Sequence, residues 1–315
     1  MGLGVGRGVD MAGTVRRLID AGLRRSPMQP YFAKRTAGLL AVLAYHDIDR
    51  PENFARHLDL LLRVMRPIGL DEVLAAWAGE PLPPRSVLVT FDDGYRSVLD
   101  HAAPMLAERE IPAVAFVIAN LLGSEEPYWW VEIEHLVRCG GRSNKLQSIP
   151  TPHQAVLHLK RLPDDARREA IHELRATASG QRLRQQQLKP GELGQLEVAG
   201  VEIGNHTFSH PCLDTCDDAT VAAEIIESHK RLTETLGREP RAFAYPNGNW
   251  DPRAENQLSN LCYSAAFLFD HRHARPGSHA LRISRLRVNS TTSIDRFAAI
   301  LSGLHPAVHN ARGGR

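Results

Sequence analysis

The sequence predicts an α/β fold in which helices wrap a parallel sheet. Short apolar runs alternate along the chain with segments whose apolar residues recur every three or four positions. Such alternation of strand and helix patterns is typical of units in which helices cover the faces of a parallel sheet. The chain has 315 residues, of which 43% are hydrophobic, so it can bury a full core.

The expected strands are short apolar runs, and the expected helices show an apolar stripe with a period near 3.6 residues. The strands are expected at residues 39–45, 86–91, 113–119, 201–205, 242–245, 264–268 and 281–288. The helices are expected at residues 53–65, 95–110, 219–236, 252–261 and 294–301. In the first of these helices, the stripe consists of Phe54, Leu58, Leu61, Leu62 and Met65.

Residues 121–190 interrupt this rhythm. They are rich in Arg, Gln and His, and they show helical patterns without a convincing strand. We expect a mainly helical insertion at one rim of the sheet. It contains the consecutive aromatic residues Tyr128, Trp129 and Trp130. These either line a sugar-binding groove or pack the insertion against the rest of the domain, because aromatic rings serve both purposes.

Residues 1–38 are interpreted as an N-terminal arm in front of a domain at residues 39–315. The first 25 residues are rich in Gly and Arg but lack the apolar segment of a secretory signal. Residues 15–23 form either a short basic amphipathic helix that touches a membrane surface or part of a disordered arm. No run of about 18 apolar residues predicts a membrane-spanning helix.

Charge and cysteine content argue against several classes of protein. There are 38 basic and 36 acidic residues, so no global field favours nucleic acid as a partner. The four cysteines include no CxxC pair and are too few for a disulfide framework. We expect free thiols at Cys139, Cys212, Cys216 and Cys262, and a cytoplasmic location with membrane association through the arm as an option.

Two adjacent carboxylates, Asp92 and Asp93, follow the expected strand at residues 86–91. Active sites of α/β barrels lie at such carboxyl ends of strands. Adjacent buried acids repel each other, so a site that holds both ionised needs a cation or a proton. A metal at Asp93 would leave Asp92 as a base, whereas a solvated Asp-Asp-Gly turn is the alternative.

A pair of histidines, His206 and His210, follows the expected strand at residues 201–205. Histidines four residues apart on one helical turn can reach a single metal ion. The chain has 15 histidines, and His305 and His309 share this spacing by chance. We interpret this second pair as solvent-exposed because no strand delivers it. The first pair follows a strand, as the carboxylates do, which indicates one shared metal site.

The motifs TFDDG at residues 90–94 and HTFSH at residues 206–210 resemble the first two motifs of the polysaccharide deacetylases, carbohydrate esterase family four. The resemblance covers about residues 39–304. It implies a distorted (β/α) barrel with fewer than eight strands and a metal-dependent deacetylation of glycans. Carried over by position, it implies that Asp92 is the catalytic base and that one divalent metal is held by Asp93, His206 and His210.

Residues 241–248, with the sequence RAFAYPNG, resemble the third family motif but depart from it. Many members have an arginine where this chain has Ala244, and that arginine orients the catalytic base. The alignment implies that the backbone N–H of Asn247 is the oxyanion donor and that Tyr245 lines the pocket. Arg285 is the candidate for the missing guanidinium, and a surface arginine is the alternative.

The late Leu-x-x-His motif, which supplies a general acid in most of the family, has no good copy after Arg285. Residues 44–48, AYHDI, resemble instead the Tyr-His motif of the branch that includes poly-N-acetylglucosamine deacetylases. The resemblance implies that His46 is the general acid. A core histidine satisfied by Asp47 or by a backbone carbonyl is the alternative.

These observations predict a hydrolase that removes N-acetyl groups from an amino sugar in a polysaccharide, oligosaccharide or glycan precursor. An O-acetyl esterase and a catalytically silent glycan-binding protein are the alternatives. Asp92 beside Asp93 argues against binding alone, because binding needs only the metal ligands. Histidine and carboxylate ligands suit zinc, while nickel and cobalt are chemically acceptable.

Overall fold

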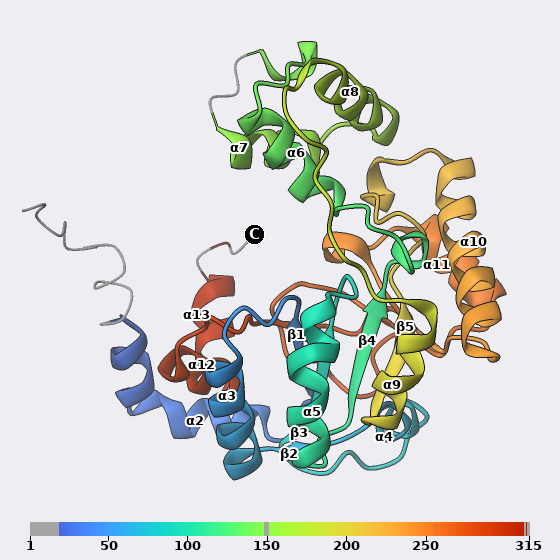
Figure 1. Ribbon diagram of the computed structural model, residues 1–315. Coiled ribbons are helices and arrows are strands. Elements are labelled where there is room, and N and C mark those ends of the chain that lie inside the picture. Colours follow the sequence, from blue (N-terminus) through green and yellow to red (C-terminus); the bar gives the residue numbers. More distant parts are fainter. Residues whose placement is uncertain (1–18, 148–150, 312, 314–315) are drawn as a thin grey trace, which may run out of the picture.

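The computed structural model describes residues 19–147, 151–311 and 313. A curled parallel sheet lies at the centre, helices surround it, and three further helices form a lobe at one end (Figure 1). The predicted architecture, a distorted (β/α) barrel with a helical insertion, is confirmed. None of the described helices combines the length and the apolar character that crossing a membrane requires.

The strands follow the order β7-β6-β5-β4-β3-β1-β8, with the two-residue β2 paired beside β3. All named strand pairs are parallel. The strand bounds are Ala41–Tyr45 (β1), Arg66–Pro67 (β2), Ser86–Phe91 (β3), Ala113–Val117 (β4), Val201–Asn205 (β5), Ala242–Ala244 (β6), Ala265–Phe267 (β7) and Leu286–Arg287 (β8). The expected strands before residue 281 are confirmed, with small shifts at their ends.

Helices surround the sheet because each parallel connection must cross one of its faces. Around the barrel lie α3 (Pro51–Val64), α4 (Leu70–Trp77), α5 (Ala103–Glu108), α9 (Leu193–Val198), α10 (Asp218–Leu236), α11 (Pro252–Asn260) and α12 (Ile294–Leu301). The helix expected at residues 95–110 consists of a π-helical turn, Val98–Ala102, followed by α5. The short helix α4 was not expected, and its Leu70 and Val73 pack into the apolar interior of the barrel.

The strand expected at residues 281–288 is wrong in its first half. A 3₁₀ turn, Ala280–Arg282, precedes Ile283, which exchanges backbone hydrogen bonds of 2.8 Å with the β7 side of the sheet. Three residues later, β8 pairs with β1. One segment therefore bonds to both edges of the sheet and closes the barrel. To reach both edges the segment must bend, and a continuous strand would not allow this bend.

The predicted helical insertion forms the lobe at the top of Figure 1. It contains α6 (Trp129–Arg138), α7 (Pro152–Leu159) and α8 (Asp164–Thr177). The lobe has its own apolar cluster, which includes Ile133, Leu159 and Leu174. Because these side chains are buried among themselves, the lobe adds a wall beside the barrel without contributing a strand.

Residues 19–25 are helical and are followed by α2 (Met28–Thr36). Asp20 accepts hydrogen bonds from Ser293 and Arg296, and Arg24 pairs with Asp295. These contacts attach the N-terminal helix to the start of α12. Residues 15–18 of the expected amphipathic segment lie outside the described residues.

The histidines at positions 305 and 309 lie in α13 (Leu304–Ala311), so their interpretation as solvent-exposed is wrong. Both are half-buried, and their rings pack about the ring of His271 at centroid distances of 5.1 and 5.0 Å. Pro306 does not prevent the helix because proline is tolerated in a first turn, where its missing N–H would have no helical partner.

Gly204 in β5 is expected to be a strict packing constraint, because a Cβ there would lie 2.5 Å from the Phe116 ring. We expect Gly204→Ala to lower the free energy of unfolding by about 1–3 kcal/mol, the range typical of overpacking. The control is Gly194→Ala in α9, where no atom lies within 4 Å of the new Cβ. It should stabilise the helix by about 0.5–1 kcal/mol. Denaturant unfolding measures both, and equal stability would contradict the packing argument.

Candidate active site

The strand register brings the predicted site residues to one rim of the barrel. Tyr45 at the end of β1 pairs with Phe91 at the end of β3, so the residues that follow, His46 and Asp92, lie side by side. Next along the sheet, the end of β4 pairs with the end of β5, which leads directly into the histidine motif. Carboxyl ends of neighbouring parallel strands meet at one edge, and the site therefore forms there.

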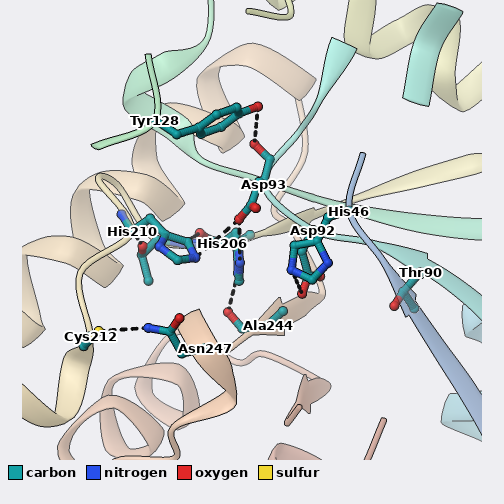
Figure 2. Close-up of polar contacts among 12 residues, drawn as sticks. His46, Thr90, Asp92, Asp93, Tyr128, His206, His210, Cys212, Ala244 and Asn247 are labelled. Atoms are coloured by element: carbon teal, nitrogen blue, oxygen red, sulfur yellow. Dashed lines mark hydrogen bonds and ion pairs between the residues drawn. The ribbon is translucent and has the colours of Figure 1, made fainter. Parts of the chain in front are cut away.

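Asp93, His206 and His210 form a buried cluster suited to a metal ion (Figure 2). The Nε2 atom of each histidine lies 3.3 Å from Oδ1 of Asp93, and the three ligand atoms lie within 4.8 Å of one another. Oδ1 of Asp93 has no hydrogen-bonding partner in the described part of the chain. A buried acceptor left without a partner and facing two ring nitrogens fits a metal site, because an ion would satisfy all three atoms.

The two imidazoles have different electrostatic environments. Nδ1 of His206 lies 2.8 Å from the carbonyl oxygen of Ala244, a hydrogen bond that leaves Nε2 free to act as a ligand. Burial lowers the pKa of His210 to about 3, which keeps this ring neutral as a ligand must be. Burial also lowers the pKa of His206, but the neighbouring carboxylates of Asp93 and Asp92 outweigh it and raise the pKa overall.

A loop, and not the expected helical turn, presents the two histidines. Thr207 and His210 have left-handed backbone conformations, with φ of 67° and 60°. The Asn205 side chain accepts a hydrogen bond from the Thr207 N–H at 2.8 Å. Glu224 of α10 accepts one from the Ser209 N–H at 2.7 Å. These contacts stabilise a backbone shape that non-glycine residues rarely adopt. Neither of these supporting side chains was predicted from the sequence.

Arg285 forms a bidentate pair with Asp92, with N–O distances of 2.6 and 2.7 Å. The arginine is fully buried, so the alternative of a surface arginine is wrong. Its Nε donates to the carbonyl oxygen of Leu268 at 2.7 Å, and its Nη1 donates to the Thr90 hydroxyl at 3.2 Å. Burial raises the pKa of Asp92, but the charge and hydrogen bonds of Arg285, together with the charges of His206 and His46, outweigh burial and hold the pKa below its ordinary value.

His46 follows β1 and lies beside the Asp92 carboxylate (Figure 2). Its Nε2 is 3.9 Å from Oδ2 of Asp92, and its side chain is 38% exposed. The ring packs edge-on against Phe269 at 5.4 Å. Within the described residues no hydrogen bond joins this ring to Asp47 or to a backbone carbonyl, and the Asp47 carboxylate accepts a short hydrogen bond from Ser97. The alternative of a satisfied core histidine therefore does not describe this side chain.

Of the two residues expected from the third motif, only Asn247 lies on the pocket wall. Its amide accepts a hydrogen bond from Nζ of Lys160 at 2.9 Å and donates one to Sγ of Cys212 at 2.8 Å. Cys212 and the other three cysteines are free thiols, as expected. The prediction that Tyr245 lines the pocket is wrong. Its ring is fully buried, and its hydroxyl donates to the carbonyl oxygen of Leu281, because the β6 register turns it toward the helices.

The site opens into a cavity of about 400 Å³. The three predicted metal ligands lie on its wall, together with Asp92, His46 and Asn247. Five further wall residues had no predicted role: Tyr95, Lys160, Gly248, Phe269 and Arg287. Tyr95 directly follows the TFDDG motif and could have been inferred from that position. Gly248 is the last residue of the RAFAYPNG motif, whereas Lys160, Phe269 and Arg287 lie outside the motifs, so no local signal marks these three.

Of the three consecutive aromatic residues of the insertion, one lies on the cavity wall and two pack the insertion against the barrel. Trp130 lies on the cavity wall, where sugar rings can stack. Trp129 donates its indole N–H to the backbone carbonyl of His210 at 2.9 Å. Tyr128 is buried, and its hydroxyl lies 3.5 Å from the backbone carbonyl of Asp93 (Figure 2). Tyr128 and Trp129 therefore pack the insertion against the backbone of the metal-ligand residues.

A family model of polysaccharide deacetylase matches residues 79–266, which is more than half of the chain. The chain belongs to the polysaccharide deacetylase family. It is accordingly a hydrolytic deacetylase of a metal-dependent family, and the cluster of Asp93, His206 and His210 is its candidate metal site. The matched segment contains this cluster and Asp92, whereas His46 and Arg285 lie outside it.

Solved deacetylase structures share the fold. PplD, a deacetylase from Streptococcus pyogenes, has a TM-score of 0.59 at 17% identity and aligns over 84% of this chain and 98% of its own. IcaB from Ammonifex degensii has a TM-score of 0.58 at 24% identity, over 84% and 97%. A de-N-acetylase from Aggregatibacter actinomycetemcomitans has a TM-score of 0.57 at 16% identity, over 83% and 99%. No curated protein sequence matches the chain.

Replacing a metal ligand should remove the metal without unfolding the protein. We expect Asp93→Ala, His206→Ala and His210→Ala each to weaken metal affinity by more than about 100-fold, since loss of supporting groups alone costs roughly 10- to 100-fold. Asp92→Asn should retain the metal. Plasma emission spectrometry of the dialysed proteins measures occupancy, with the exposed His153→Ala as control. Full occupancy in His206→Ala would refute this ligand set.

Proposed function

We propose that the protein removes N-acetyl groups from an amino sugar of a polysaccharide, oligosaccharide or glycan precursor. One observation carries the proposal: an ionised carboxylate, Asp92, lies next to a metal-ligand cluster but is held by Arg285 instead of joining it. A base beside a metal site is the arrangement that amide hydrolysis requires. An amide substrate is also supported by the similar fold of a protein described as a de-N-acetylase.

We propose zinc as the metal, held by Asp93, His206 and His210, with nickel and cobalt as chemically acceptable substitutes. One carboxylate and two imidazoles are a common donor set for catalytic zinc and leave positions open for water and substrate. When bound, the ion would supply Lewis acidity, lowering the pKa of water and polarising the acetyl carbonyl. Burial of the cluster excludes bulk water, which strengthens such electrostatic effects.

In this mechanism Asp92 accepts the proton of the attacking water. Arg285 keeps Asp92 ionised and fixes the orientation of its two oxygens, so Asp92 is a base and not a ligand. The backbone N–H of Asn247 is the proposed donor to the oxyanion that develops on the acetyl carbonyl, because preorganised N–H groups stabilise such charge. The side chain of Asn247, bonded to Lys160 and Cys212, holds this residue on the pocket wall.

His46 then gives a proton to the departing nitrogen. An amide nitrogen leaves as an amine only if it is protonated, so an acid must lie near the scissile bond. His46 lies on the same wall as Asp92, and its exposed edge faces the cavity from which substrate enters. The products are acetate and a free amino sugar.

Acetate release tests this function directly. N-acetylglucosamine oligomers and O-acetylated glycans of matched length are incubated with the metal-loaded protein, with and without chelator. We expect chelator-sensitive acetate release from the N-acetylated oligomers. Release from the O-acetylated glycans alone would identify an O-acetyl esterase, and glycan binding without any release would identify a binding protein.

Arg285→Ala should shift the acidic limb of the pH-rate profile to higher pH. The sign follows from the charge, because removing the cation that lowers the pKa of Asp92 lets that pKa rise, and the base then becomes protonated at a higher pH. Arg285→Lys keeps one charge but loses the bidentate contact, so its limb should lie between those of the wild type and the alanine variant. Initial rates from pH 4 to 9 measure this shift.

The control for this experiment is Arg282→Ala, which removes a nearby arginine that pairs with Glu255 and lies outside the active-site cavity. Its acidic limb should match that of the wild type. An unshifted limb in a folded Arg285→Lys or Arg285→Ala protein would mean that Asp92 is not the titrating base.

His46→Ala should bind metal normally and lose about 10²- to 10⁴-fold in the rate of amide hydrolysis, the usual range for acid–base catalysis. The loss should be much smaller on an activated aryl ester, whose leaving group needs no proton. Comparing kcat for the two substrates in the same variant measures this difference. Equal losses on both substrates, or near-normal amide hydrolysis, would place the general acid elsewhere.

A further inference from the structure

The active-site cavity contains two cations that form no ion pair with a carboxylate of the described residues. Arg285 on the inner side is paired with Asp92, but Lys160 and Arg287 on the wall form no ion pair within the described residues. Their hydrogen-bonding partners are neutral. Nζ of Lys160 donates to the side-chain oxygen of Asn247 at 2.9 Å, and Nε of Arg287 donates to the carbonyl oxygen of Phe269 at 2.8 Å.

Arg287 is held in a position that suits a bidentate anion. Arg287 is the last residue of β8 and pairs with Ala44 of β1, which precedes His46 by two residues. The guanidinium of Arg287 lies 4.9 Å from the centre of the Phe269 ring. With Nε bonded, the two terminal nitrogens have no hydrogen bond in the described structure. The nearby carboxylate of Asp270 is already bonded to the Ser284 hydroxyl and to a backbone N–H. A fixed guanidinium fork matches the geometry of a carboxylate or phosphate.

Lys160 enters the same cavity from the insertion, directly after α7. Its ammonium lies 5.9 Å from the centres of both the Trp129 and the Trp130 rings. Burial lowers the pKa of Lys160, and it also lowers the pKa of Arg287. An unpaired cation in a half-buried wall costs free energy unless an anion compensates it.

A metal in the ligand cluster increases this imbalance. Asp93 would offset only part of the charge of a divalent ion, and Asp92 is already offset by Arg285. The loaded cavity is therefore positive, with Lys160 and Arg287 adding to the field of the ion. A neutral acetylated sugar can accept hydrogen bonds from these cations but cannot offset their charge. A neighbouring sugar with a free amine, cationic at neutral pH, would be repelled.

We propose that Lys160 and Arg287 select glycans that carry a carboxylate or phosphate group next to the acetylated amino sugar. This inference rests on the proposed deacetylase function and names the substrate class of the same site. The terminal nitrogens of Arg287 bind the anion, and Lys160 attracts it from the insertion wall. The amino sugar to be deacetylated then lies beside this anion, at the metal cluster.

The test compares three oligosaccharides of equal length with the full-length, metal-loaded protein. One contains only N-acetylglucosamine, one has glucuronate beside the N-acetylglucosamine, and one has a phosphate on the neighbouring sugar. We expect kcat/KM for at least one acidic glycan to exceed that for the neutral glycan by roughly 10- to 100-fold, in line with charge-assisted hydrogen bonds. The better acidic substrate identifies the anion as carboxylate or phosphate.

Arg287→Met and Lys160→Met should each reduce the ratio of acidic to neutral kcat/KM by roughly tenfold. Arg287→Lys, which keeps the charge but not the fork, should retain part of the preference. The matched controls are Arg272→Met and Lys189→Met, which remove the same charge from exposed positions outside the cavity and should leave the ratio unchanged.

The outcomes separate this inference from the proposed function. A wild-type ratio near one, or a ratio unchanged in both Arg287→Met and Lys160→Met, overturns the inference while the deacetylase function stands. If the wild type releases acetate from none of the three glycans, the proposed function fails. Calorimetric binding of the same glycans to the wild type then tests the inference, with stronger binding of an acidic glycan supporting it and equal binding overturning it.

Discussion

The buried pair of Arg285 and Asp92 connects the chemistry of this protein to the closure of its barrel. Arg285 belongs to the segment that bonds to β7 on one side and pairs with β1 on the other. From this seam it reaches across to the end of β3 and also holds the carbonyl oxygen of Leu268. Loss of one partner of a buried ion pair costs about 3–5 kcal/mol, because the other charge remains uncompensated. Barrel closure thus delivers to Asp92 the cation that helps to lower its pKa.

Backbone strain is concentrated around the same rim. Asp93, Thr207, His210 and Asn247 all have positive φ, which costs non-glycine residues of order 1–3 kcal/mol each. The surrounding contacts enforce these conformations, as in the hydrogen bonds that Glu224 of α10 accepts from the backbone N–H groups of Phe208 and Ser209. Such a loop places two imidazoles on one carboxylate oxygen, whereas a regular helical turn at this position would direct them along a shared face.

Different parts of the fold supply different groups of residues to the cavity. The barrel strands supply the carboxylates and histidines at their carboxyl ends, where chemistry occurs. The insertion supplies Trp130 and Lys160, and the closing strand supplies Arg287. In our proposal, residues outside the motifs determine which sugar fits, because they surround the reacting groups without taking part in the proposed bond changes. A family with one chemistry can in this way serve different glycans by changing its loops and insertions.

The sequence by itself determined most of the strands and helices, apart from α4 and the bend in the closing segment, and it marked the residues of the candidate metal cluster. Periodicity and motifs are local features, and parallel strands align their carboxyl ends. It also indicated that Arg285 replaces the arginine absent at Ala244. Only the tertiary structure decided that Arg285 is fully buried against a partner 193 residues away. It alone turned Tyr245 away from the pocket and brought Lys160 and Arg287 into it. These outcomes depend on closure of the barrel and docking of the insertion, and such long-range contacts leave no periodic trace in the sequence.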